Sequence, residues 1–175
     1  MKPAVYRAGQ FLHYWRNAPL NPTAQTRVDS ILPTPALRTL FHQLSPGEQA
    51  HSLNVLLRVE ARCPAAPPEL LQAALLHDVG KTRAPLNMAD RALGVLGQEL
   101  FPNTWERWGQ GQPHGWRKTF VVAMQHAAWG ADLVAEAGAP PLTVALIRRH
   151  QTRVTTPASL EDELLKHLQA ADNES

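Results

Sequence analysis

This chain of 175 residues has a single cysteine, almost no excess of positive over negative charge, and no long apolar runs. Its only cysteine, Cys63, cannot form an intrachain disulfide, and a metal site built from several thiolates is excluded as well. Lysine and arginine number 17 against 15 aspartates and glutamates, which leaves a net charge of +2 and no basic stripe. A protein that binds duplex nucleic acid neutralises many phosphates, so we expect no duplex nucleic acid as a partner.

The apolar runs are too short for a membrane. Runs such as residues 73–76 and 120–124 fall far below the roughly 20 apolar residues of a membrane-spanning helix. Residues 1–20 mix charged and polar side chains among the apolar ones and lack the continuous apolar segment of a secretory signal. We therefore expect a cytoplasmic protein without membrane contact. Its composition, 44% hydrophobic and 18% charged, fits one globular domain.

Strand-like alternation of apolar and polar residues is also missing, and proline and glycine divide the chain into helix-sized pieces. The predicted fold class is therefore all-α, a single-domain helical bundle. The clearest start is Ser45-Pro46-Gly47-Glu48, a capping box with proline at the first helical position, whose helix should end before Pro64. Pro67-Pro68-Glu69 should open another helix, which continues through Leu76 and has Gly80 as its C-terminal cap.

The remaining segments are predicted from apolar spacing and from glycine and proline stops. Residues 17–35 should be a connector with one helical turn at 28–32, and residues 101–116, rich in Trp, Gly and Pro, a loop or lid. Further helices are expected at residues 5–15, 36–44, 87–100, 117–127, 129–137, 141–150 and 159–171.

Histidines and aspartates lie near the ends, or in the first turns, of five predicted helices. A single histidine on an apolar helix is more often structural than a ligand, so the joint pattern carries the argument. Asp78 directly follows the apolar run 70–76, where an ionised carboxylate is costly unless it is paired or coordinated. Imidazole and carboxylate ligands without sulfur suit Mn, Fe, Co, Ni, Zn or Mg. The residues concerned are His51, His77, Asp78, His126, His150 and Asp172.

The order His51, His77-Asp78 and Asp172 resembles the HD superfamily of metal-dependent phosphohydrolases, over about residues 45–175. His126 and His150 fall where the binuclear branch of that superfamily carries two additional histidines, although alanine follows His126 where proline is usual. The resemblance implies an HD-type domain at 45–175, with residues 1–44 as a helical extension packed on it. It also implies one or two divalent ions, the first held by His51, His77, Asp78 and Asp172, and the second by His126 and His150 with Asp78 bridging.

The resemblance further implies an enzyme that uses a metal-activated water to cleave a phosphomonoester or phosphodiester bond. The expected substrate is a small phosphorylated compound, a nucleotide or dinucleotide. No second histidine directly follows His150 and no Gly-Tyr-Pro motif appears, so the branch of cyclic-di-GMP phosphodiesterases that carries this motif is disfavoured. Val79-Gly80-Lys81 stands where alarmone hydrolases carry a Glu-Asp pair after His-Asp. Two alternatives stay open: a phosphodiesterase on short RNA ends, which the small charge excess weakens, and a non-catalytic helical module that binds a nucleotide or a regulatory partner.

Catalytic roles are assigned to Asp78 and Lys81. Lys81, Arg149 and Arg153 are the candidate phosphate contacts, against the alternative of an exposed basic face that also includes Arg148. If a single ion binds, His126 and His150 become candidates for substrate contact or proton transfer. The tryptophans of residues 101–116 either fill core or stack a base over the site. The oligomeric state is not indicated.

Overall fold

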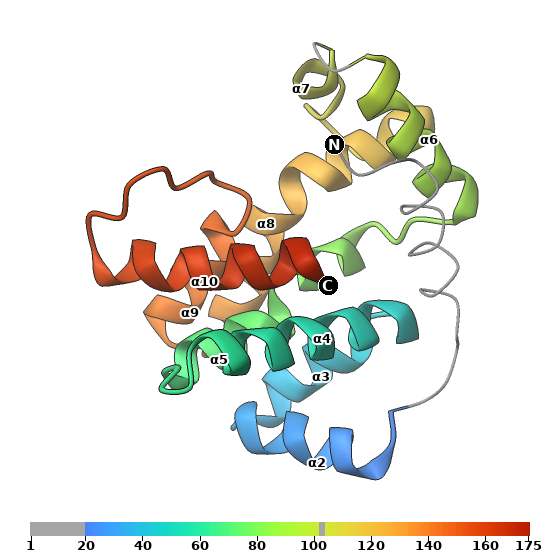
Figure 1. Ribbon diagram of the computed structural model, residues 1–175. Coiled ribbons are helices and arrows are strands. Elements are labelled where there is room, and N and C mark those ends of the chain that lie inside the picture. Colours follow the sequence, from blue (N-terminus) through green and yellow to red (C-terminus); the bar gives the residue numbers. More distant parts are fainter. Residues whose placement is uncertain (1–19, 102–103) are drawn as a thin grey trace.

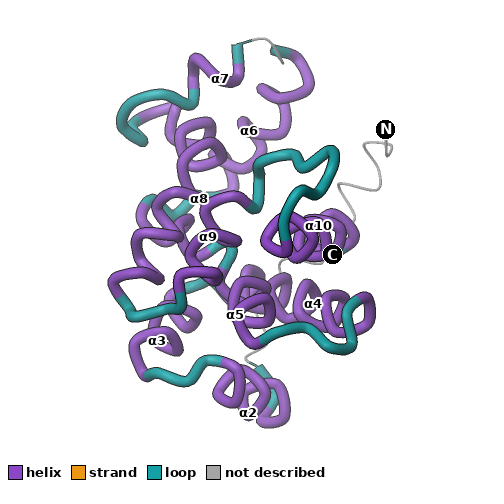
Figure 2. The backbone as a smooth tube through the Cα atoms, turned by 90° about the vertical axis from the view of Figure 1, so that its left-hand side faces the viewer, coloured by secondary structure: helices purple, strands orange, loops and turns teal. Residues whose placement is uncertain are grey.

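The computed structural model describes residues 20–101 and 104–175, and every regular element in these ranges is a helix (Figures 1 and 2). The all-α prediction is confirmed, while the helix expected at residues 5–15 lies outside the described residues. Among the described helices, none combines the length and apolar character needed to cross a membrane. In chain order the elements are α2 (Pro22–Ile31), α3 (Pro35–Gln43), α4 (Pro46–Arg62), α5 (Pro68–Leu76), the 3₁₀ helix η1 (Val79–Arg83), α6 (Met88–Leu100), α7 (Trp105–Trp108), the 3₁₀ helix η2 (Gly115–Arg117), α8 (Lys118–Glu136), α9 (Pro141–Arg149) and α10 (Leu160–Glu174).

Local capping explains where the helices begin. Ser45 accepts a hydrogen bond from the Glu48 amide while the Glu48 carboxylate accepts one from the Ser45 amide, so the capping box of α4 is confirmed. Asn87 and Asp90 form the same reciprocal pair at the start of α6. Proline occupies the first turn of α2, α3, α4, α5 and α9, where no intrahelical partner exists for an amide proton.

Three expectations within the described chain are wrong. The connector predicted at 17–35 contains a ten-residue helix, α2, because Asn21 caps this helix and Pro22 occupies its first position. The two helices predicted at 117–127 and 129–137 are one continuous helix, α8, which ends at Glu136 and is followed by Gly138 with φ of +80°. Gly80 does not cap α5, which ends at Leu76, but lies inside η1.

The helices form a bundle from which α6 and α7 project. Helices α2–α5, α9, α10 and the C-terminal part of α8 pack around the core, whereas α6 and α7 lie along the N-terminal part of α8 (Figures 1 and 2). Buried side chains of α2 and α3, such as Val28, Leu37 and Phe41, belong to the same core as those of α5 and α10. The core therefore continues across residue 45, and the domain boundary proposed there stays a prediction.

A close backbone contact joins η1 to α8. A Cβ atom at Gly80 would lie 1.9 Å from the His126 carbonyl oxygen and 2.6 Å from the Gly130 amide nitrogen. At Gly130, an added Cβ would lie 3.1 Å from the Gly80 nitrogen. Glycine is therefore required at Gly80 by the approach of backbone to backbone, and this contact sets Asp78 and Lys81 beside His126.

Replacing Gly80 by alanine should destabilise the protein, because the new methyl group meets backbone that cannot move independently. We expect a loss of about 1–3 kcal/mol in the free energy of unfolding, as for other overpacked sites, measured by urea denaturation. Gly115→Asn is the control, since Gly115 faces open space at φ of +55°, a conformation that asparagine tolerates. Equal stability of Gly80→Ala and the unaltered protein would show that the contact is not constrained.

Candidate metal centre

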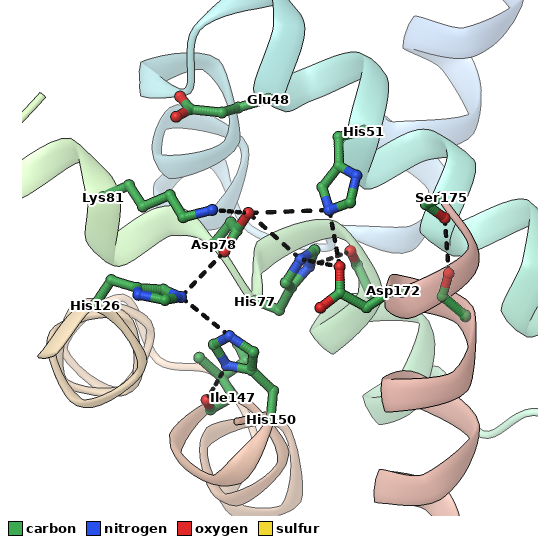
Figure 3. A network of polar contacts seen from close by, with 12 residues as sticks. Glu48, His51, His77, Asp78, Lys81, His126, Ile147, His150, Asp172 and Ser175 are labelled. Carbon is green, nitrogen blue, oxygen red and sulfur yellow. Dashed lines mark hydrogen bonds and ion pairs between the residues drawn. The ribbon is translucent and has the colours of Figure 1, made fainter. Parts of the chain in front are cut away.

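The structure brings all six predicted ligands into one cluster, hereafter the metal centre (Figure 3). They come from distant parts of the chain: α4 presents its ligand from the second turn, α8 from its middle, α9 at its C-cap and α10 from its last turn, while two ligands stand between α5 and η1. These side chains are His51, His126, His150, Asp172 and the pair His77 and Asp78. They form two groups, in each of which the candidate ligand atoms lie within 4.8 Å of one another.

The first group consists of His51, His77 and Asp172. Asp172 Oδ1 lies 2.9 Å from His51 Nε2, with which it is hydrogen-bonded, and 3.5 Å from His77 Nε2. His77 is fully buried, whereas the Asp172 side chain keeps 34% of its surface exposed. This half of the centre is therefore the one closer to solvent.

The second group consists of Asp78, His126 and His150, and all three residues are buried. His126 Nε2 lies 3.3 Å from Asp78 Oδ1 and 3.1 Å from His150 Nε2. Figure 3 shows the two imidazoles and the carboxylate directed toward one another.

Asp78 connects the two groups. Its Oδ1 faces His126, while its Oδ2 lies 3.6 Å from His77 Nε2 and 4.0 Å from His51 Nε2. The same Oδ2 accepts a hydrogen bond from the Lys81 ammonium. A carboxylate directed to both sides in this way can bridge two cations.

Backbone carbonyls fix the orientation of three imidazoles. Nδ1 of His77 donates to the carbonyl oxygen of Ala74 at 3.0 Å, and Nδ1 of His126 donates to that of Val122 at 2.9 Å. His150 Nδ1 likewise donates to the carbonyl oxygen of Ile147 at 2.7 Å. Because a carbonyl can only accept, the proton of each neutral ring is on Nδ1, and the Nε2 lone pair faces the centre. Metal-ligating histidines are commonly oriented by such bonds.

These lone pairs lack a positive partner among the described residues. Burial lowers the pKa of His150 to about 3, so His150 is neutral at pH 7 and its Nε2 lone pair lies 3.1 Å from His126 Nε2. His77 Nε2 is buried without a hydrogen bond, since the nearest Asp172 and Asp78 oxygens are 3.5 and 3.6 Å away. A divalent ion in each group would satisfy these nitrogens, so the residues present fit a metal.

The two carboxylates make the centre anionic. Burial alone would raise the pKa of Asp78, but the neighbouring Lys81, His77 and His126 bring it well below its usual range. Asp172 behaves in the same way: burial would raise its pKa, and the hydrogen bond with His51 and the nearby His77 lower it. Burial also works against a charged His77, yet Asp78 and Asp172 raise its pKa. Ionised carboxylates in so buried a site attract a cation.

The three predicted phosphate contacts have different surroundings. Lys81 lies in the metal centre on Asp78. Arg149 instead joins α9 to the start of α10 through ion pairs with Glu161 and, at 2.7 Å, Asp162. Arg153 is exposed on the segment between α9 and α10. Phosphate contacts by Arg149 and Arg153 stay predictions, and the neighbouring Arg148 is paired with Asp132.

A groove beside the metal centre was not predicted from the sequence. It has a volume of about 680 Å³ and lies between α6 and α8, so it is hereafter called the α6–α8 groove. Lys81 and His126 line it, as does Arg91 of α6, which is ion-paired at 2.9 Å with the buried Glu48 of α4. Glu48 is recognisable in the sequence as a cap, but its second partner lies 43 residues away and leaves no local signal.

Comparison with known proteins identifies a family. The family model described as HD domain matches residues 49–174, more than two thirds of the chain, and this range contains all six candidate ligands. No curated protein and no solved structure matches the chain.

The geometry predicts two separable metal sites. We expect the unaltered protein to bind two Mn²⁺ ions per chain in equilibrium dialysis, and His51→Ala and His150→Ala each to bind one, because each substitution removes a ligand from a different group. His114→Ala, at an exposed histidine outside both groups, should still bind two. If His150→Ala kept both ions, the assignment of the buried group would be refuted.

Proposed function

The chain belongs to the HD domain family, and from this premise we propose that it is a metal-dependent phosphohydrolase acting on a small phosphorylated substrate. The observation that carries the proposal is the pair of candidate ligand groups joined by Asp78, in which imidazole nitrogens and carboxylate oxygens face one another. Ligands of this type in two adjacent groups are typical of centres that hydrolyse phosphate esters.

The ions and the protein have distinct parts in the reaction. Bound divalent ions would lower the pKa of a coordinated water toward neutrality and offset negative charge on the phosphate. The chain keeps the ligands in place: the carbonyl oxygens of Ala74, Val122 and Ile147 hold three imidazoles, so little reorganisation is needed during the reaction. Asp78 keeps both groups at a fixed separation.

Lys81 is the residue best placed to contact the phosphate. Its ammonium is bonded to Asp78 Oδ2, and its side chain also lines the α6–α8 groove. An ammonium has three N–H donors, so Lys81 can hold Asp78 and donate to a phosphate oxygen at once. Lys81 therefore connects the metal centre with the bound substrate.

Among small phosphorylated compounds we propose a nucleotide or dinucleotide, acted on in the cytoplasm. The adjoining groove offers room for a group larger than phosphate, and its lining combines cationic with apolar side chains. Short RNA ends are the second candidate within the same chemistry. The net charge of +2 supports a small substrate, since longer nucleic acid requires more cations.

Metal dependence is the direct test of the proposed function. Protein stripped of metal should be inactive toward a phosphomonoester and a phosphodiester of p-nitrophenol, and addition of Mn²⁺, Fe²⁺, Co²⁺, Ni²⁺, Zn²⁺ or Mg²⁺ should restore release of p-nitrophenolate from at least one. Protein that binds metal and nucleotides yet cleaves neither ester nor any nucleotide of a panel would instead be a non-catalytic module.

Replacing Lys81 by methionine should lower kcat/KM roughly 10²-fold, the effect of removing one donor that stabilises transition-state charge. Metal content should be unchanged, because Lys81 is not a ligand. Lys118→Met is a matched control: Lys118 is equally exposed, at 27%, and is bonded to Pro85 and Asp90 outside the metal centre. Steady-state kinetics and metal analysis on the same samples decide the matter, and unchanged kcat/KM in Lys81→Met would exclude the phosphate contact.

A further inference from the structure

The α6–α8 groove begins at the metal centre and follows α8 toward its N-terminus. Lys81 and His126 line the groove where it meets the centre. Other lining residues on α8 extend from Ala128 to Thr119, a length of about 13 Å at 1.5 Å per residue. Helices α6 and α7 form the opposite wall and lie along this part of α8 (Figures 1 and 2).

The cations of the groove are already matched by carboxylates. Lys81 is paired with Asp78, Arg91 with Glu48, and Arg148 with Asp132. Each pair is nearly neutral, so the groove adds little net positive charge beyond the metal centre. A chain of additional phosphates would meet little net attraction there. The groove therefore suits a ligand whose charge is confined to the end at the metal centre.

The part of the groove away from the metal centre is apolar and aromatic. Val95 of α6, Trp105 of α7, and Val122 and Met124 of α8 line it. The Trp105 indole packs edge-to-face on Phe120, with ring centroids 5.2 Å apart. Phe120 precedes His126 by six residues on α8, about 9 Å along the helix axis. Through its contact with Phe120, the Trp105 indole therefore lies toward the N-terminus of α8, about 9 Å from His126 along the helix axis, which is of the order of the separation between a base and its phosphate.

We propose that the α6–α8 groove binds the nucleoside part of a nucleoside monophosphate, with the base on the indole of Trp105. Aromatic side chains accept the flat face of any base, which explains how a groove with few free polar groups can select a nucleotide. Arg91, held by the buried Glu48, stands with Lys81 near the phosphate end, because Glu48 lies one helical turn before His51 (Figure 3). This inference rests on the proposed function, which supplies the bond to be cleaved.

Two substrates that differ only in the base test the proposal. Adenosine 5′-monophosphate should have a kcat/KM at least about tenfold above that of ribose 5-phosphate, since stacking on an aromatic ring has an effect of that order. Adenosine diphosphate and triphosphate should be poorer substrates than the monophosphate, because the groove offers further phosphates little net charge. A triphosphate hydrolysed faster than the monophosphate would overturn the inference.

Two variants separate stacking from folding. Trp105→Leu keeps an apolar side chain on Phe120 but removes the flat surface, so the ratio of kcat/KM for adenosine 5′-monophosphate to that for ribose 5-phosphate should fall to about one, mainly through a higher KM for the nucleotide. Trp116→Leu is the control: Trp116 belongs to the same aromatic cluster, is 55% exposed and does not line the groove, so the preference should persist. An unchanged preference in Trp105→Leu would refute the stacking role.

A binding measurement without turnover distinguishes failure of this inference from failure of the proposed function. Adenosine, which has no phosphate to lose, should quench tryptophan fluorescence of the full chain, and Trp105→Leu should abolish the quenching. Quenching without hydrolysis of either phosphate ester would support the groove and reject the phosphohydrolase. Hydrolysis of both esters at equal kcat/KM, without quenching, would reject the groove and leave the phosphohydrolase in place.

Discussion

The carboxylate of Asp78 is the point on which both halves of the metal centre depend. One of its oxygens faces the buried pair His126 and His150, and the other faces His51 and His77. Around it lie imidazoles that backbone carbonyls hold in place, and a second carboxylate, that of Asp172. Burying so many acceptors together is unfavourable unless positive charge is placed among them. This cluster of side chains therefore suits a cation site better than it suits an ordinary protein core.

The fold brings these side chains together from several helices and through one close contact between η1 and α8. Because α4, α8, α9 and α10 each contribute one ligand from a different direction, no single helix determines the geometry. The Gly80–Gly130 contact lets η1 approach α8 closely enough for Asp78 to meet His126. The remaining wall of the site is supplied by α6 and α7, which contribute no ligand and instead line the α6–α8 groove. The candidate ligands and the outer wall of the groove therefore come from different helices.

The sequence predicts helix starts well, because caps are local: Ser45 with Glu48 marks the beginning of α4 without reference to any other element. It fails where distant packing decides, as in the uninterrupted α8, whose Gly130 is accommodated by contact with η1 rather than by a break. The six candidate ligands could be selected because their order resembles a known family, although their spacing alone left open whether they meet. The partnerships of Arg149 with Asp162 and of Arg91 with Glu48 could not be predicted, since opposite charges far apart in sequence have many possible partners.

The central claim is that two cations lie on either side of Asp78, and a crystal structure of Mn²⁺-loaded protein with anomalous scattering data would test it most directly. The account predicts two anomalous peaks, one among His51, His77 and Asp172 and one between His126 and His150, with the Asp78 carboxylate between them. Density for manganese elsewhere on the protein, or none within bonding distance of Asp78, would contradict the account.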